Sequence, residues 1–158
     1  MRIIGHALVT DQTPHETGRA LLAKLYRELT RDPLPEIRTT SRGKPYFAGS
    51  ALHFSVTHTG RHVFCALADH PIGIDAEEVD RPIRLALAEK ILSPGEYTRW
   101  QRASDSRLAL LKLWVLKEAY YKFTGDGLRG YPNKTNFSPE DPRIITEHGC
   151  LLAIIEGE

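Results

Sequence analysis

Hydrophobic residues near the start of the chain follow two different spacings. Residues 2–9 read RIIGHALV, a run that suits a β-strand. Between residues 21 and 29 the apolar residues recur at helical spacing, and the preceding T-P-H-E at 13–16 supplies the N-cap, first-turn proline and acid of a capping box. The pattern predicts a strand over 2–9 and a helix that begins near Pro14 and ends at Asp32-Pro33.

Three strand-like runs follow in the middle of the chain. Residues 52–57 and 62–68 are separated by Thr59-Gly60-Arg61 and predict a β-hairpin. A third run, 72–77, comes after the turn at Asp69-His70-Pro71. We expect these strands to lie side by side and antiparallel at the centre of the sheet.

Helical spacing returns in the second half of the chain. It covers residues 84–92, a second capping box at 93–96 begins another helix, and a long helix is predicted over about 106–123. Gly125-Asp126-Gly127 ends that helix, because glycine readily takes the left-handed conformation.

The last two predicted strands are 143–147 and 150–156, joined at His148-Gly149. The succession of strands and helices predicts an α+β fold in which an antiparallel sheet packs with the long helix. At 158 residues the chain is expected to form a single domain over 1–158.

Composition narrows the class of protein. Apolar residues make up 41% of the chain and no apolar run approaches the ~20 residues of a membrane span, so we expect a soluble protein. Met1 leads directly into the first strand without the pattern of a signal peptide, which favours a cytoplasmic location. The net charge of +1 provides no global field for nucleic acid or anionic membrane. Cys65 and Cys150 lie among apolar neighbours and are expected to be reduced core thiols.

The strand 72–77 carries two carboxylates on one face. Its period of two places Gly73, Asp75 and Glu77 on one side, which we expect to face outward, and the apolar residues on the other. The two acids could share a hard cation through oxygen ligands, and the glycine would leave room for a bulky ligand. A strand whose exposed face happens to be acidic explains the same pattern.

The long helix places Trp114, Glu118 and Lys122 four residues apart along one face. A solvated Glu-to-Lys pair, worth about 0.3–0.5 kcal/mol, accounts for two of them. The density of apolar and aromatic residues around this row instead favours the border of a cleft. Elsewhere, Lys44 and Thr57-His58-Thr59 have the character of a phosphate cradle.

Four motifs in order resemble the 4'-phosphopantetheinyl transferases of the surfactin-synthetase-activating type. They are Arg42-Gly43-Lys44-Pro45, residues 54–60 (FSVTHTG), residues 73–77 (GIDAE), and residues 114–122 (WVLKEAYYK) with Gly125-x-Gly127. The resemblance covers roughly residues 36–137. It implies the fold of that family, with two similar halves of which the first is shortened here to one strand and one helix.

The resemblance implies transfer of the 4'-phosphopantetheine arm of coenzyme A to a serine of an apo acyl or peptidyl carrier protein. The carriers are those of fatty-acid, polyketide or nonribosomal peptide synthesis, and the product is adenosine 3',5'-bisphosphate. Asp75, Glu77 and Glu118 would hold Mg²⁺, with Glu118 as base and Lys122 stabilising the leaving phosphate. The implied coenzyme A contacts are Lys44, Thr57, His58, Lys117 and Lys122.

An acidic carrier would find a local surplus of basic residues in the stretch 81–107. These residues are Arg81, Arg84, Lys90, Arg99, Arg102 and Arg107. A solvated helix face is the alternative interpretation of the same residues.

Two other functions compete with transfer. A chain that keeps coenzyme A binding but has lost transfer would share these motifs. A metal-dependent nuclease would use Asp75 and Glu77, but the position two residues after Glu77, where such sites commonly carry lysine, is Val79, and the near-neutral charge is unfavourable for gripping a phosphate backbone.

Overall fold

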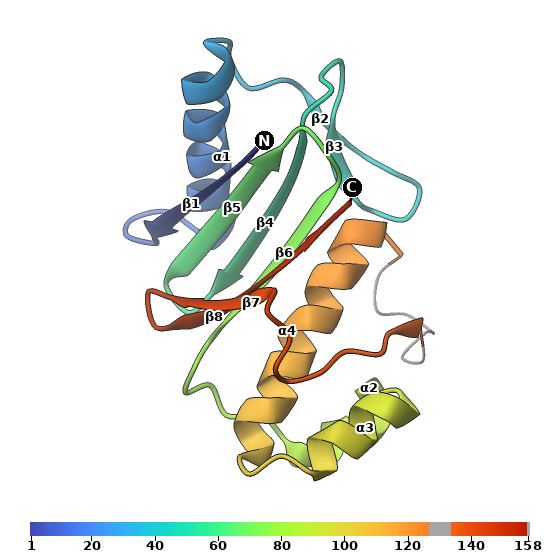
Figure 1. Ribbon diagram of the computed structural model, residues 1–158. Coiled ribbons are helices and arrows are strands. Elements are labelled where there is room, and N and C mark those ends of the chain that lie inside the picture. The colour runs from blue at the N-terminus through green and yellow to red at the C-terminus, as the bar shows by residue number, and fades with distance from the viewer. Residues whose placement is uncertain (127–133, 158) are drawn as a thin grey trace.

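The first part of the chain forms a three-stranded sheet covered by one helix. The computed structural model describes residues 1–126 and 134–157. The elements are β1 (Arg2–Leu8), α1 (Pro14–Thr30), β2 (Ile37–Thr39), β3 (Pro45–Phe47), β4 (His53–Thr59) and β5 (His62–Ala68). Strands β1, β5 and β4 pair antiparallel in that order, and β2 and β3 form a separate two-stranded ribbon (Figure 1).

The second part repeats this plan. Its elements are β6 (Ile72–Glu78), the 3₁₀ turn η1 (Leu85–Leu87), α2 (Ala88–Ile91), α3 (Pro94–Gln101), α4 (Ser106–Thr124), β7 (Ile144–Glu147) and β8 (Cys150–Glu156). Strands β6, β8 and β7 pair antiparallel in that order. In the described residues no helix is both long enough and apolar enough to cross a membrane.

The expected α+β class and most of the expected elements are confirmed. Both capping boxes form, Thr13 with Glu16 at the start of α1 and Ser93 with Glu96 at the start of α3. The stretch 84–92 divides into η1 and α2. Strands β2 and β3 were not predicted, because three residues are too few to establish a period of two.

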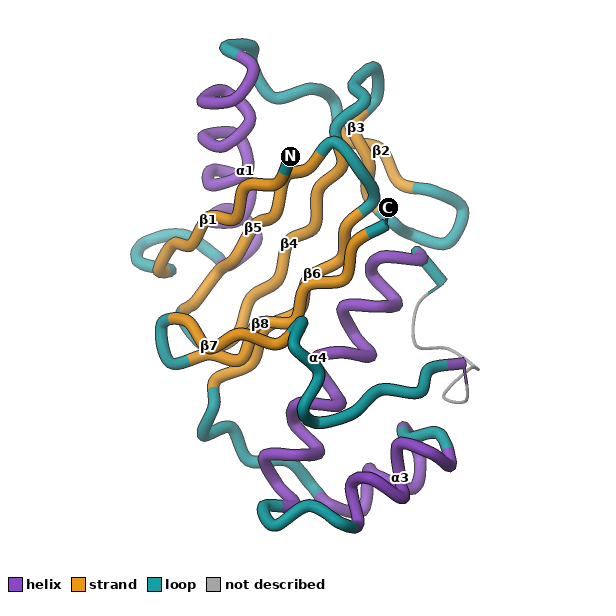
Figure 2. The backbone as a smooth tube through the Cα atoms, in the orientation of Figure 1, coloured by secondary structure: helices purple, strands orange, loops and turns teal. Residues whose placement is uncertain are grey.

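One predicted neighbour relation is wrong. Strand β6 is not the third antiparallel strand of the β4–β5 hairpin but pairs through its backbone with β8, about 80 residues further along the chain. It still lies beside β4, as Figures 1 and 2 show. The chain therefore forms two sheets that meet along β4 and β6.

Alternate residues of β5 belong to different cores. Val63, Cys65 and Leu67 pack against α1, whereas Phe64 and Ala66 pack against the second sheet. This division follows from the period of two of a strand, and it makes β5 buried on both faces. The layers are therefore α1, the first sheet, the second sheet and α4.

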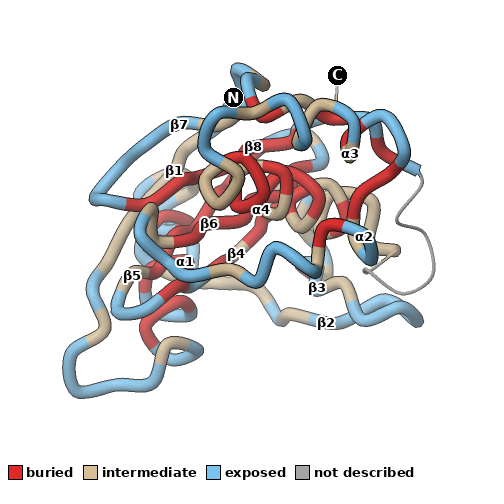
Figure 3. Tube along the Cα trace, turned by 90° about the horizontal axis from the view of Figure 1, so that it is seen from below, coloured by how far each residue is buried: buried red, intermediate tan, exposed pale blue. Residues whose placement is uncertain are grey.

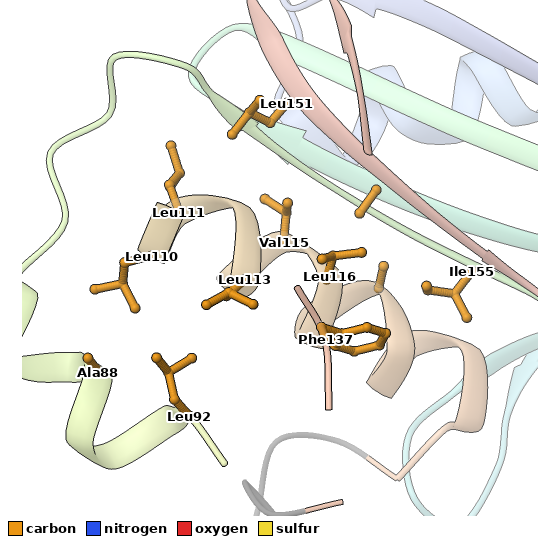
Figure 4. Packing of buried hydrophobic residues seen from close by; sticks show 12 residues of the cluster. Ala88, Leu92, Leu110, Leu111, Leu113, Val115, Leu116, Phe137, Leu151 and Ile155 are labelled. Carbon is orange, nitrogen blue, oxygen red and sulfur yellow. The ribbon is translucent and has the colours of Figure 1, made fainter. Parts of the chain in front are cut away.

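Strand β8 divides in the same way. Leu151, Ala153 and Ile155 pack against α4 (Figure 4), and Leu152 and Ile154 face the first sheet. Burial is accordingly continuous along β6, β8 and the inner side of α4 (Figure 3).

Gly73 allows α4 to lie directly on β6. A Cβ atom at this position would lie 2.2 Å from the carbonyl oxygen of Ala119 and 2.3 Å from the amide nitrogen of Phe123. The expectation that Gly73 leaves room for a ligand is therefore wrong, because the helix backbone fills that space.

The two cysteines are free and buried, as expected of core thiols. Burial raises the pKa of the Cys65 thiol to about 12.

Candidate active site

A cavity of about 450 Å³ opens between α1, the turn before β3, β4 and α4. Six basic side chains line it: His15, Arg19, Arg42, Lys44, His58 and Lys122. Glu118 is the acidic residue that joins them on the wall. Such a surface suits a ligand with several negative charges.

Asp75 lies next to this cavity on the face of β6 that α4 covers. The expectation that this acidic face looks outward is wrong, since the Asp75 residue is only 7% exposed. Its Oδ1 accepts hydrogen bonds from Thr57 Oγ1 and from Lys122 Nζ, both at 3.0 Å. Its Oδ2 is buried and has no hydrogen-bond partner among the described residues. Burial raises the pKa of Asp75, and the positive charge of Lys122 opposes that rise.

Glu77 is held more completely than Asp75. Its Oε2 accepts a hydrogen bond from Thr59 Oγ1 at 3.0 Å, and its Oε1 forms an ion pair with Arg81. Burial raises the pKa of Glu77, while the hydrogen bond from Thr59 and the charge of Arg81 act in the opposite direction. Both carboxylate oxygens are therefore engaged.

Glu118, on α4, lies near Asp75 and Glu77. Its pKa is raised to about 7, first by burial and then by the negative charge of Asp75, with a smaller contribution from Glu77. Lys122, one helical turn away, partly offsets this effect. The structure thus brings together the three carboxylates and the lysine that the two motifs predicted as neighbours.

The carboxylates do not form a preassembled metal cluster. Within residues 1–126 and 134–157, no three His, Cys, Asp or Glu side chains are grouped so as to hold a metal ion. Lys122 instead supplies the positive charge beside Asp75. A hard divalent cation nevertheless fits the donor set. Asp75 Oδ2 lacks a partner among the described residues, and the charges of Asp75 and Glu77 add to burial in raising the pKa of Glu118 to about 7.

The basic residues of the cavity differ in how firmly they are held. Lys44 Nζ donates a hydrogen bond to the carbonyl oxygen of Phe123 at 2.5 Å, near the end of α4. Burial lowers the pKa of Lys44. Arg42 forms an ion pair with Asp126.

Helix α1 adds two cavity residues that are not part of the predicted site, His15 and Arg19. They are four residues apart, a spacing that places both on one face of the helix. That spacing was the available signal, but nothing in the sequence indicated that this face meets the cavity. Like His58, both are exposed, and in the described part of the chain none of the three has a hydrogen-bond or ion-pair partner.

Two predicted coenzyme contacts do not line the cavity. Lys117 is only 1% exposed, and its Nζ contacts Glu96 Oε1 at 2.7 Å and Thr135 Oγ1 at 2.6 Å. Adjacent helical residues point about 100° apart, which separates Lys117 from Glu118. Thr57 is also buried, with its hydroxyl turned toward Asp75. Gly127 of the last motif lies outside the described residues.

Half of the basic residues of the stretch 81–107 are engaged within the molecule. Arg81 pairs with Glu77, Arg99 donates to Asn136, and Arg107 donates to the carbonyl oxygen of Val79. The other three are exposed: Arg84, Lys90 and Arg102.

Comparison with known proteins places this site in a family. The sequence profile of the 4'-phosphopantetheinyl transferase superfamily matches residues 71–150, just over half of the chain, including Asp75, Glu77, Glu118 and Lys122. The chain belongs to the 4'-phosphopantetheinyl transferase superfamily. The resemblance drawn from the four motifs is thereby confirmed.

Relatives within this superfamily come from several bacteria. The chain is 36% identical over 116 residues to the 4'-phosphopantetheinyl transferase psf-1 of Bacillus pumilus, an alignment that covers 70% of this chain and 49% of the relative. It is 33% identical to the 4'-phosphopantetheinyl transferase gsp of Aneurinibacillus migulanus, over 70% of this chain and 48% of that protein. The putative 4'-phosphopantetheinyl transferase of Haemophilus influenzae is 30% identical over 73% of this chain and 51% of its own length. The chain thus spans about half the length of the curated relatives it matches.

Proposed function

We propose that this chain transfers the 4'-phosphopantetheine arm of coenzyme A to a serine hydroxyl of an apo carrier protein, with Mg²⁺ at the carboxylates. The observation that carries the proposal is the meeting of two charge patterns in one place. Asp75 and Glu118 lie beside a cavity whose walls carry basic side chains from α1, β4 and α4. Coenzyme A is polyanionic, and its pyrophosphate needs a cation where the reaction occurs.

In the proposed reaction the serine oxygen forms a bond to the phosphorus that carries pantetheine. The bond from that phosphorus to the bridging oxygen breaks, and adenosine 3',5'-bisphosphate leaves with this oxygen. Glu118 accepts the serine proton. Its pKa of about 7 belongs to the metal-free site, and a bound cation lowers it. Lys122, on the cavity wall, would stabilise the charge on the leaving phosphate.

Asp75 and Glu118 would hold the Mg²⁺ directly, through Asp75 Oδ2 and one oxygen of Glu118. Glu77 would add its charge while its oxygens stay bound to Thr59 and Arg81. The cation would neutralise negative charge on the pyrophosphate as the bond breaks. Phosphoryl transfer depends mainly on such positioning and electrostatic stabilisation.

The remaining phosphate of coenzyme A would be bound by the basic wall of the cavity. Lys44 has three ammonium protons and uses one on Phe123, so it retains donors for a ligand. His58 and Arg19 add charge from β4 and α1. Arg19 would supply a contact that the four motifs do not contain.

The carrier protein would dock on the exposed part of the stretch 81–107. Arg84, Lys90 and Arg102 offer positive charge there, and Leu85, which is 45% exposed, offers an apolar contact. Acidic surface on the carrier would complement this patch. Fatty-acid, polyketide and peptide carriers all share the acceptor serine that the proposal requires.

The test is a modification assay with purified protein, coenzyme A, MgCl₂ and a panel of apo carriers. Intact mass spectrometry should show one added phosphopantetheine group on a carrier, and EDTA should prevent the addition. Asp75→Asn and Glu118→Gln should lower the rate by at least about a hundredfold, an effect typical of removing charge from a phosphoryl-transfer site. Glu28→Gln, at an exposed position of α1, is the matched control.

The same preparation distinguishes transfer from binding alone. Coenzyme A binding by calorimetry together with unmodified carriers in the whole panel would favour a binding module. Modification at an unchanged rate in Asp75→Asn and Glu118→Gln would refute the assignment of the site.

A further inference from the structure

Two sheets meet along β4 and β6, yet neither strand pairs with the other through its backbone. Both strands lie entirely within the described residues, and every ladder of β6 is with β8. The strands nevertheless lie beside each other along their length (Figures 1 and 2). Because buried amide groups require partners, another set of acceptors must serve the free edge of β6.

Three side-chain hydroxyls of β4 provide these acceptors. Ser55 Oγ accepts from the amide of Ile74 at 3.0 Å, Thr57 Oγ1 from that of Ala76 at 3.3 Å, and Thr59 Oγ1 from that of Glu78 at 3.3 Å. The hydroxyls are two residues apart and so are the amides, so the two strands run in the same direction. We refer to Ser55, Thr57 and Thr59 as the hydroxyl seam.

Two members of the seam also contact the carboxylates. Thr57 Oγ1 donates to Asp75 Oδ1 at 3.0 Å, and Thr59 Oγ1 donates to Glu77 Oε2 at 3.0 Å. A hydroxyl has a single proton, so accepting from the amide of Ala76 and donating to Asp75 fixes the orientation of Thr57. Ser55 accepts a hydrogen bond from the amide of Ile74 and contacts neither Asp75 nor Glu77.

The contacts of Asp75 show what this orientation achieves. Thr57 and Lys122 both bind Oδ1, which leaves Oδ2 buried without a partner among the described residues. Glu118 approaches this carboxylate closely enough for Asp75 to raise its pKa. The side-chain torsions of Asp75 are thus set by contacts to one oxygen, and the other oxygen stays free.

We propose that Thr57 and Thr59 are positioning residues that orient Asp75 and Glu77 for the divalent cation, and that Thr57 makes no contact with coenzyme A. The inference rests on the proposed function for the presence of the cation. The motif resemblance implies that the Thr57 hydroxyl donates a hydrogen bond to a phosphate of coenzyme A. The present proposal gives the threonine hydroxyls a different role. The cavity agrees with this assignment, since Ser55, Val56 and His58 line it and Thr57 does not.

The experiment measures metal binding without turnover. Mn²⁺ serves as the probe in place of Mg²⁺, and free Mn²⁺ is counted by electron paramagnetic resonance as it is titrated into the full chain in the absence of coenzyme A. Thr57→Val keeps the shape of the side chain and removes the hydroxyl. It should weaken Mn²⁺ binding by about tenfold or more, as removal of groups that orient metal ligands typically does.

Three further variants separate positioning from stability. Thr57→Ser keeps the hydroxyl and should bind Mn²⁺ within about twofold of wild type, and Thr59→Val should weaken binding less than Thr57→Val because Arg81 still holds Glu77. Ser55→Ala removes a seam hydrogen bond that touches neither carboxylate. It should lower the melting temperature and leave Mn²⁺ affinity unchanged. Thr57→Ala replaces Thr57→Val if the valine variant does not fold.

Wild-type affinity for Mn²⁺ in Thr57→Val would overturn the proposal, as would an equal loss in Ser55→Ala. A parallel assay of the Michaelis constant for coenzyme A should show no increase in Thr57→Val at saturating Mg²⁺, and a large increase would restore Thr57 as a coenzyme contact. If wild type binds Mn²⁺ and the variants rank as expected while no carrier is modified, the proposed transfer fails and the positioning role stands.

Discussion

Ionisation of Glu118 should destabilise the metal-free protein. Its folded-state pKa is about 7 against an ordinary value of 4.5. The folded state therefore binds the Glu118 proton more tightly than the unfolded state does. The stability that this proton provides is complete below about pH 4.5 and is lost as the pH rises to about 7. At about 1.4 kcal/mol for each tenfold change in proton affinity, the full loss would be about 3 kcal/mol for a shielded group. Glu118 is partly exposed, and solvent screening reduces our expectation to about 1–2 kcal/mol.

The assay is urea unfolding in EDTA between pH 4.5 and 8 for wild type, Glu118→Gln and the exposed control Glu28→Gln. As the pH rises over this range, the free energy of unfolding of wild type and of the control should fall by about 1–2 kcal/mol more than that of Glu118→Gln. Adding Mg²⁺ at pH 8 should stabilise wild type and leave Glu118→Gln largely unaffected, since a ligand that binds only the folded state raises its stability. Parallel pH profiles for wild type and Glu118→Gln in EDTA would refute the electrostatic account of this residue.

Three other perturbations test the fold and the docking surface. Gly73→Ala should lower the stability measured by thermal unfolding by about 1–3 kcal/mol, because the Cβ of the new alanine would meet the backbone of α4. Unchanged stability would contradict the close approach of α4 to β6. Glu96→Ala should cost about 3–5 kcal/mol because it leaves the Lys117 ammonium buried without its carboxylate, and the paired change Glu96→Leu with Lys117→Met should recover much of that loss in the same unfolding assay. Arg84→Glu together with Lys90→Glu should raise the Michaelis constant for an acidic carrier severalfold while that for coenzyme A stays constant, and equal effects on both would argue against docking at this patch.

Local signals in the sequence were sufficient for most of the elements. The capping boxes at Thr13 and Ser93 depend on contacts within three residues, and they appear in the structure as predicted. The pairing of β6 could not be obtained this way. Its partner β8 lies about 80 residues away, and the apolar face of β6 is compatible with either sheet.

The site was predictable where helical spacing or strand period decided it. Four-residue spacing brought Glu118 and Lys122 together, and the strand period kept Asp75 with Glu77. Lys117 was assigned through the resemblance alone, although its position next to Glu118 already points it in another direction. The orientation of Thr57 depends on an amide of another strand, and no local pattern carries that information.

The cavity draws its charges from both parts of the chain. The acidic group comes from β6 and α4, the basic wall comes largely from α1, β4 and the turn before β3, and Lys44 spans the two by donating to Phe123. Neither sheet with its helix contains both the acidic group and the basic wall. A fragment ending after β5 and a fragment beginning at β6 would therefore each lack part of the proposed site. If the proposed transfer holds, activity recovered on mixing them would report the docking of the two sheets directly.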